Sequence, residues 1–247
     1  WKSDWVEGPT GMGSIGLGRM LVSFGFKGSA GPFHFAAPDA YSGASGPVAG
    51  VLSTASKAMG FVALMRVLIG VTMADDGSEW TLLIGVVAAI TMTWGNIAAL
   101  GSRNPKRMLA YSSVAHAGYI LIGVTVGNTL GQSGVLFYLA VYTITNLGAF
   151  ASIIAISNLT NSEKTSDFIG VGRVAIFPAI VLTIALISLT GAPPTAGFIG
   201  KVYLFNAAVQ SDYTWLAIVG VVNSVISAYY YWKVIRIMYQ SSGASTD

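Results

Sequence analysis

Long apolar runs with the length of a membrane span constrain this chain more than any other feature. Of its 247 residues, 53% are hydrophobic and only 9% are charged, whereas a soluble domain carries roughly 25% charged residues. A membrane-spanning helix needs about 20 consecutive apolar residues. The chain therefore has room for about seven such helices and short loops, and its composition predicts an all-α polytopic membrane protein.

Seven apolar runs follow one another, and polar or helix-breaking residues separate them. The sixth run is too long for one straight crossing, and the segment Thr190–Pro194 interrupts it; the first ends in the cluster Gly28–Pro32. Because glycine and proline clusters end or break helices, two of the seven helices are expected to be discontinuous. The runs cover approximately Met12–Ala30, Val48–Met73, Glu79–Leu100, Lys106–Val126, Ser133–Ser157, Val174–Ala208 and Tyr213–Tyr239.

Basic residues are distributed unevenly over the two ends of the predicted bundle. Seven crossings place alternate loops on opposite membrane faces, and one face receives almost all the Lys and Arg near loops. By the positive-inside rule this face is cytoplasmic, so the N-terminal end is predicted outside and the C-terminal end inside. The residues on this face are Arg103, Lys106, Arg107, Lys164, Arg173, Lys233 and Arg236.

Five ionisable side chains lie within or beside the apolar runs. They are Lys27, His34, Lys57, His116 and Lys201. A charge at the bilayer centre costs about 2.5–3.5 kcal/mol even on the lenient insertion scale, so each is a candidate functional residue. The alternative for the lysines is that they extend to the membrane interface, and for the histidines that they serve packing.

The surroundings of these residues favour proton transfer. Burial disfavours the charged form of a lysine and a nearby carboxylate favours it, so a change in surroundings can load or unload a proton. Helix breaks lie beside Lys27 and Lys201, and unwound backbone at membrane depth is tolerated only inside protein or beside a water-filled cavity. His116 follows Ser112 and Ser113 by about one turn, and these residues form a polar stripe on one helix.

Several residue types are absent from the places where other chemistry needs them. The chain has no cysteine and only two histidines, so we expect no thiolate, iron–sulfur or haem site and no cofactor. No Asp or Glu lies inside an apolar run, and buried cations without anionic partners are costly. We therefore expect the partner carboxylates in a neighbouring subunit or in an N-terminal part that precedes Trp1 in a longer chain.

The motifs in order resemble the antiporter-like membrane subunits of proton-pumping NADH:quinone oxidoreductase (complex I). The resemblance covers nearly the whole chain and is strongest to subunit N, since subunit M would carry a glutamate where Lys201 stands. The stretches that carry it are Phe26–His34, Ala37–Tyr41, Ser53–Lys57, Gly95-Asn96, Lys106–Ser113, His116–Tyr119, Gly191–Lys201, Asn223–Ser227 and Tyr229–Tyr231.

The resemblance implies a subunit of about fourteen transmembrane helices that contains two inverted five-helix repeats. This chain would then hold helices seven to thirteen. Residues 1–11 would be an extracytoplasmic loop, 12–74 the last two helices of the first repeat, 79–240 the second repeat and 241–247 a polar tail.

The resemblance also implies roles for the ionisable residues. Lys27 would pair with a glutamate outside this chain, Lys57 would be the central proton relay with His116 nearby, and Lys201 would be the exit site. The subunit itself would do no redox chemistry, because NADH (or another donor) and quinone are used elsewhere in the complex. Its partners would be the lipid bilayer, other membrane subunits and neighbouring antiporter-like subunits, in a prokaryotic inner membrane.

Two alternatives remain open on sequence grounds. One is a subunit of a multisubunit cation/proton antiporter or membrane-bound hydrogenase of the same superfamily, which would show sodium-dependent transport. The other is a structural scaffold whose lysines serve assembly, in which case lysine variants would assemble poorly.

Overall fold

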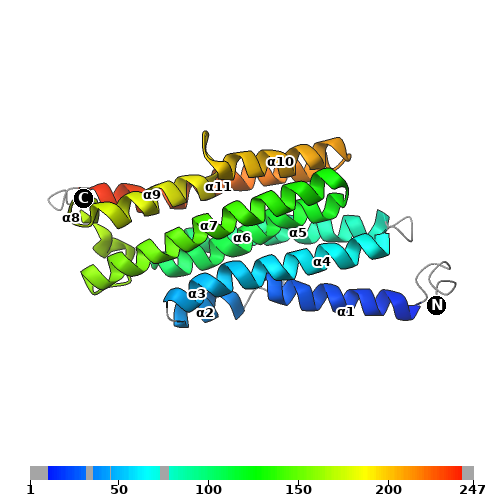
Figure 1. Ribbon diagram of the computed structural model, residues 1–247, viewed down its shortest axis with the longest axis horizontal. Coiled ribbons are helices and arrows are strands. Elements are labelled where there is room, and N and C mark those ends of the chain that lie inside the picture. Colours follow the sequence, from blue (N-terminus) through cyan, green and yellow to red (C-terminus); the bar gives the residue numbers. More distant parts are fainter. Residues whose placement is uncertain (1–10, 32–35, 45, 73–77, 241–247) are drawn as a thin grey trace.

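The computed structural model describes residues 11–31, 36–44, 46–72 and 78–240, and the described chain is helical with short connections (Figure 1). The all-α prediction is confirmed. The elements are α1 (Gly11–Gly28), α2 (Ala36–Gly43), α3 (Gly46–Val51), the π-helical turn η2 (Leu52–Ser56), α4 (Lys57–Thr72), α5 (Ser78–Leu100), α6 (Pro105–Val126), α7 (Thr129–Thr160), the 3₁₀ turn η3 (Thr165–Phe168), α8 (Val171–Val174), α9 (Ile176–Thr190), α10 (Ala196–Gln210) and α11 (Thr214–Tyr239).

Five helical stretches of the described chain are long and apolar enough to cross a membrane by themselves. A sixth passes the same test only as a bent pair, residues 165–174 and 176–190, which meet at 118°. The multi-pass prediction is therefore confirmed, while the count of seven crossings and their numbering in a longer subunit stay predictions. The five stretches are Pro47–Leu68, Trp80–Leu100, Pro105–Val126, Thr129–Thr160 and Thr214–Tyr239.

Large apolar side chains cover much of the outer surface of the bundle. Val174, Phe177 and Ile144 are 86%, 80% and 75% exposed, and large apolar side chains of the other described helices are exposed as well. In a bilayer the same residues face lipid at no cost. The pattern of exposure thus agrees with the membrane assignment made from composition.

Helix α6 forms the centre of the bundle, with 89% of its most apolar window buried. It packs against α5 at very short distance, because a Cβ at Gly95 would lie 2.5 Å from the Ala115 nitrogen and one at Gly118 would lie 2.6 Å from the Met92 nitrogen. Small residues at such crossings let membrane helices approach closely. The central position of α6 brings its polar stripe into contact with α4, α7 and α11.

The expected break of the sixth apolar run is present between α9 and α10. Gly191 ends α9 with φ +83, a left-handed conformation that glycine adopts without strain. Thr195 then caps α10, since its side chain accepts a hydrogen bond from the Phe198 nitrogen. Each of the two helices has 15 residues and is therefore about 22 Å long at about 1.5 Å per residue. Because a hydrocarbon layer is about 30 Å thick, neither helix crosses it alone, and the break between them lies within its thickness.

Candidate functional site

Lys57 begins α4 directly after the π-helical turn η2. Its side chain is only 1% exposed, and its Nζ donates hydrogen bonds to the carbonyl oxygen (2.7 Å) and to Oγ (2.9 Å) of Ser113 on α6. The Tyr41 ring lies on another side of the ammonium group, with its centroid 6.0 Å from Nζ. Lys57 is thus a buried cation held by neutral oxygen atoms and a ring face.

The π-helical turn before Lys57 was not anticipated from the sequence. Five residues, Leu52–Ser56, form it, and Ser53 and Thr54 are buried and bond back to the Gly50 carbonyl. Single π-turns occur frequently at functional sites. No glycine or proline lies within η2, so the usual sequence signals of a helix irregularity are missing inside it.

His116 lies in the middle of α6 and is 2% exposed. Its Nδ1 lies 2.6 Å from the Tyr138 hydroxyl of α7, and its Nε2 lies 3.2 Å from the Tyr231 hydroxyl of α11. The Tyr231 hydroxyl also bonds to Ser112 Oγ. Because a neutral imidazole has one donor and one acceptor nitrogen, His116 can accept a hydrogen bond from one phenol and donate one to the other.

The contacts that hold Lys57 and His116 lie next to each other along α6. Ser113 holds Lys57, while Ser112, the preceding residue, bonds to the tyrosine that holds His116. The structure therefore places the Lys57 ammonium group of α4 against α6 at Ser113, about one turn from His116. Tyr138 and Tyr231 were not singled out as site residues, since a tyrosine in an apolar run is indistinguishable from a packing residue.

Lys201 lies on α10 beside the break and is 3% exposed. Its Nζ donates to the carbonyl oxygen of Thr190 (2.8 Å), the last residue of α9, and to Ser224 Oγ of α11 (3.2 Å). The ammonium group also lies 4.6 Å from the Tyr119 ring centroid, within the range of a cation–π contact. The last carbonyl groups of a helix lack partners within it, so the break itself creates an acceptor for Lys201.

A second polar group lies beside Lys201, built from two amides and two phenols. Asn96 Nδ2 donates to Asn223 Oδ1 (3.0 Å) and to the Tyr119 hydroxyl (3.4 Å), and Asn96 Oδ1 accepts from the Tyr230 hydroxyl (3.0 Å). These residues come from α5, α6 and α11. Tyr119 joins this group to Lys201, because its hydroxyl group bonds to Asn96 and its ring contacts the ammonium group.

The other two predicted site residues are not part of this arrangement. Lys27, near the end of α1, is exposed, and its side chain runs along Gly60 of α4. His34 lies outside the described residues. Their roles stay predictions.

No carboxylate contacts the buried lysines within the described part of the chain. The one ion pair found there joins Lys106 and Glu163 at the end of the bundle. The expectation that anionic partners for the lysines come from elsewhere remains open. Among the same described residues, no three His, Cys, Asp or Glu side chains gather as metal ligands.

Comparison with known proteins shows which family the sequence of this chain matches. Residues 9–227 match the family model described as NADH:quinone oxidoreductase/Mrp antiporter, transmembrane. NADH-quinone oxidoreductase subunit N of Trichlorobacter lovleyi is 47% identical over 230 residues, which are 93% of this chain and 47% of the relative. The chain thus spans about half the length of the curated relatives it matches.

Solved structures of large membrane complexes contain the same fold. A chain of respiratory complex I from Thermus thermophilus superposes with a TM-score of 0.79 at 31% identity, covering 96% of this chain and 52% of the other. A chain of the archaeal membrane-bound sulfane sulfur reductase superposes with a TM-score of 0.88 at 27% identity, covering 94% and 48%.

Proposed function

Because this chain belongs to the NADH:quinone oxidoreductase/Mrp antiporter transmembrane family, we propose that it forms part of a proton-translocating subunit of NADH:quinone oxidoreductase. In this proposal NADH (or another donor) and quinone react in other subunits, and this chain binds no cofactor. Conformational and electrostatic changes reach it from neighbouring membrane subunits, including other antiporter-like subunits. The relatives named subunit N and the complex I chain support this proposal over other members of the family.

One observation carries the proposal: two lysines, 1% and 3% exposed, flank a histidine that two phenols hold inside a membrane bundle. A buried ammonium group held only by neutral oxygens loses its proton far more easily than one in water. Lys57 therefore acts as the central relay, His116 as the polar bridge and Lys201 as the terminal site. Tyr231 and Tyr138 provide hydroxyl groups on either side of His116.

The remaining assignments extend this scheme beyond the described contacts. Lys27 exchanges proton affinity with a glutamate contributed from outside this chain, and its exposed side chain on α1 leaves room for that partner. His34 serves as a further relay. The chain lies in a prokaryotic inner membrane with its basic loop end in the cytoplasm, which agrees with the positive-inside rule.

The test is proton pumping measured together with quinone reduction in membranes that carry Lys57→Ala or Lys201→Ala in the full-length subunit. We expect pumping to be lost while the complex remains assembled, because each substitution removes a proton-carrying group from the path. Lys164→Ala is the matched control, since Lys164 is exposed in a loop at the bundle end. Wild-type pumping by assembled Lys57→Ala and Lys201→Ala complexes would contradict the proposal.

The Mrp-type antiporter is the second candidate, because the family description includes it. Transport measurements on the same membranes distinguish the antiporter from the oxidoreductase. Sodium-dependent proton exchange in the absence of quinone reduction would favour the antiporter, whereas pumping that requires quinone reduction favours the oxidoreductase.

A further inference from the structure

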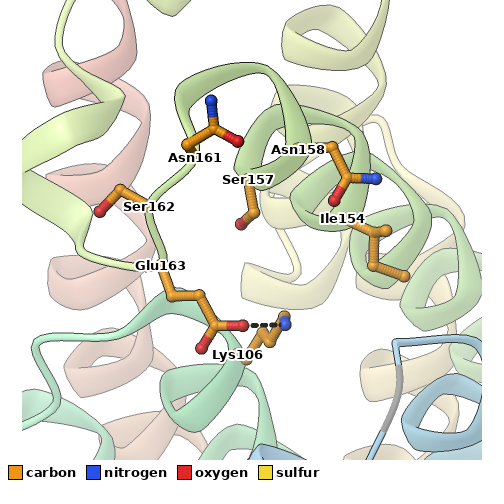
Figure 2. Close-up of a pocket in the computed structure, with 7 residues that line it drawn as sticks. All are labelled: Lys106, Ile154, Ser157, Asn158, Asn161, Ser162 and Glu163. Atoms are coloured by element: carbon orange, nitrogen blue, oxygen red, sulfur yellow. Dashed lines mark hydrogen bonds and ion pairs between the residues drawn. The ribbon is translucent and has the colours of Figure 1, made fainter.

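A polar cavity of about 570 Å³ opens at the basic end of the bundle, away from the residues of the proposed proton path. It lies between the last turns of α7, the start of α6 and the loop that follows α7 (Figure 2). The side chains that line it are Lys106, Ile154, Ser157, Asn158, Asn161, Ser162 and Glu163.

The position of the cavity corresponds to the headgroup layer of a bilayer. Helix α7 has 32 residues and is therefore about 48 Å long, whereas the hydrocarbon layer is about 30 Å thick. A helix longer than the layer is thick extends beyond the acyl chains at an end, and the polar loop 161–164 that follows α7 favours this end. Leu159 in the last turn of α7 is 63% exposed.

The cavity contains one charge of each sign. The Lys106 ammonium group and the Glu163 carboxylate bond to each other at one side of it (Figure 2), and their side chains are 12% and 50% exposed. A lysine ammonium has three donor hydrogens and a carboxylate accepts several hydrogen bonds. Both groups therefore keep capacity for a ligand that carries an anion and a cation close together.

A buried hydroxyl group in the same cavity lacks a partner. Ser157 is 9% exposed, and its Oγ makes no hydrogen bond within the described residues. Buried polar atoms are almost always hydrogen-bonded, and an exception calls for an explanation such as a bound water or ligand. The Ser157 side chain points into the space between α7 and the loop (Figure 2).

We propose that this cavity binds the phosphoethanolamine headgroup of a membrane phospholipid. The phosphate accepts hydrogen bonds from Lys106 and Ser157, and the primary ammonium group donates to Glu163. A purely anionic headgroup would face the Glu163 carboxylate without a cation, and a choline headgroup has no N–H to donate. The site therefore selects phosphatidylethanolamine over phosphatidylglycerol and phosphatidylcholine.

The test uses the full-length subunit in its assembled complex, purified in detergent and supplied separately with each of these three lipids. Native mass spectrometry counts the lipids retained. In the Ser157→Ala and Lys106→Met variants we expect the affinity for one bound phosphatidylethanolamine molecule to fall about tenfold. This is the effect of losing one charge-assisted hydrogen bond. Glu163→Gln should abolish the preference over phosphatidylglycerol. Lys164→Met and Asp212→Asn, which lie outside the cavity, are the matched controls.

Ser157→Ala removes a single oxygen atom and leaves the packing intact, so it keeps the test interpretable if a charge variant assembles poorly. Unchanged retention in all three cavity variants would overturn the proposal. Equal competition by soluble phosphoethanolamine would assign the site to a free phosphate compound. Loss of a neighbouring subunit with an unchanged lipid count would assign it to a protein partner.

Discussion

At the scale of single residues, the described structure surrounds its buried cations with neutral oxygens and ring faces. Lys57 contacts Ser113 and Tyr41, and Lys201 contacts Thr190, Ser224 and Tyr119. Such partners satisfy the N–H groups but do not neutralise the charge. The protein thus fixes the position of each ammonium group without a carboxylate from the described residues, as the proposed proton carriers require.

The Tyr231 hydroxyl group links Ser112 to His116. We expect Tyr231→Phe to lower proton pumping several-fold while the complex still assembles. The substitution removes the hydroxyl group that bonds to both Ser112 and His116, and the partners left unpaired cost roughly 1–3 kcal/mol of stability. Proton pumping per quinone reduced is the measurement. Tyr229→Phe is the control, because Tyr229 lies two residues away and is 69% exposed; an equal effect of the two variants would argue against the relay.

At the scale of helices, irregular backbone lies next to both buried lysines. The π-helical turn η2 ends one residue before Lys57, and the break between α9 and α10 lies beside Lys201. At the break α9 and α10 lie in close contact, and a glycine at the contact permits this.

Gly197 makes that contact, and Gly197→Ala tests it. A Cβ at this position would lie 1.9 Å from the Ser188 carbonyl oxygen, so α10 would have to move away from α9 and carry Lys201 with it. We expect a loss of stability of about 1–3 kcal/mol, typical of overpacking, together with impaired pumping. Thermal unfolding of the assembled complex is the measurement. Gly148→Ala, whose Cβ would make an ordinary 3.7 Å contact, should leave both unchanged.

The loop after α7 is attached to the start of α6 by the Lys106–Glu163 pair, and this attachment should depend on pH. The hydrogen bond from Lys106 holds the pKa of Glu163 below its usual value of 4.5. A depressed carboxyl pKa stabilises the folded form above the unfolded pKa, and this contribution is lost as pH falls through the folded value.

Amide hydrogen exchange at residues 161–168 should therefore accelerate as pH is lowered below about 4.5, once the intrinsic pH dependence of exchange is subtracted. The effect should be modest, because half-exposed ion pairs contribute little. Glu163→Gln should reduce the pH dependence at these amides but not abolish it, because hydrogen bonds from Ser162 and Ser166 also hold the pKa of Asp167 below its usual value. A variant with the full wild-type pH dependence would show that the Lys106–Glu163 pair does not tie down the loop.

At the scale of the whole molecule, the bundle has two ends of different charge. The segments 101–104 and 161–170 lie together at one end, where the Thr165 nitrogen donates a hydrogen bond to the Arg103 carbonyl oxygen. The segments 127–128 and 211–213 lie together at the other end, where Asn128 bonds to Ser211. Most Lys and Arg gather at the first end (Figure 1, left).

Single cysteines can establish which end faces the cytoplasm, because this chain has none of its own. We expect Lys164→Cys to be protected from a membrane-impermeant maleimide in intact cells and Asp212→Cys to be labelled. Permeabilised cells, in which both positions should react, are the control. The reverse labelling pattern would invert the orientation derived from the positive-inside rule.

Much of this molecule followed from local sequence patterns. Helix limits were predicted to within a few residues for α5, α6 and α11, because apolar length and the flanking polar residues are local properties. The break at Gly191 was predicted from the sequence Gly191-Ala-Pro-Pro. Lys57, His116 and Lys201 were selected as candidates because a charge or an imidazole in an apolar run stands out by itself.

The tertiary structure alone decided which of these residues meet. Lys57 and Ser113 are 56 positions apart and His116 and Tyr231 are 115 apart, so their contacts depend on how whole helices pack. The cavity at Glu163 and the turn η2 likewise could not be predicted from local sequence patterns. Hydrophobic length and charge are read along the chain, whereas hydrogen-bond partners and cavities arise between segments that only close packing brings together.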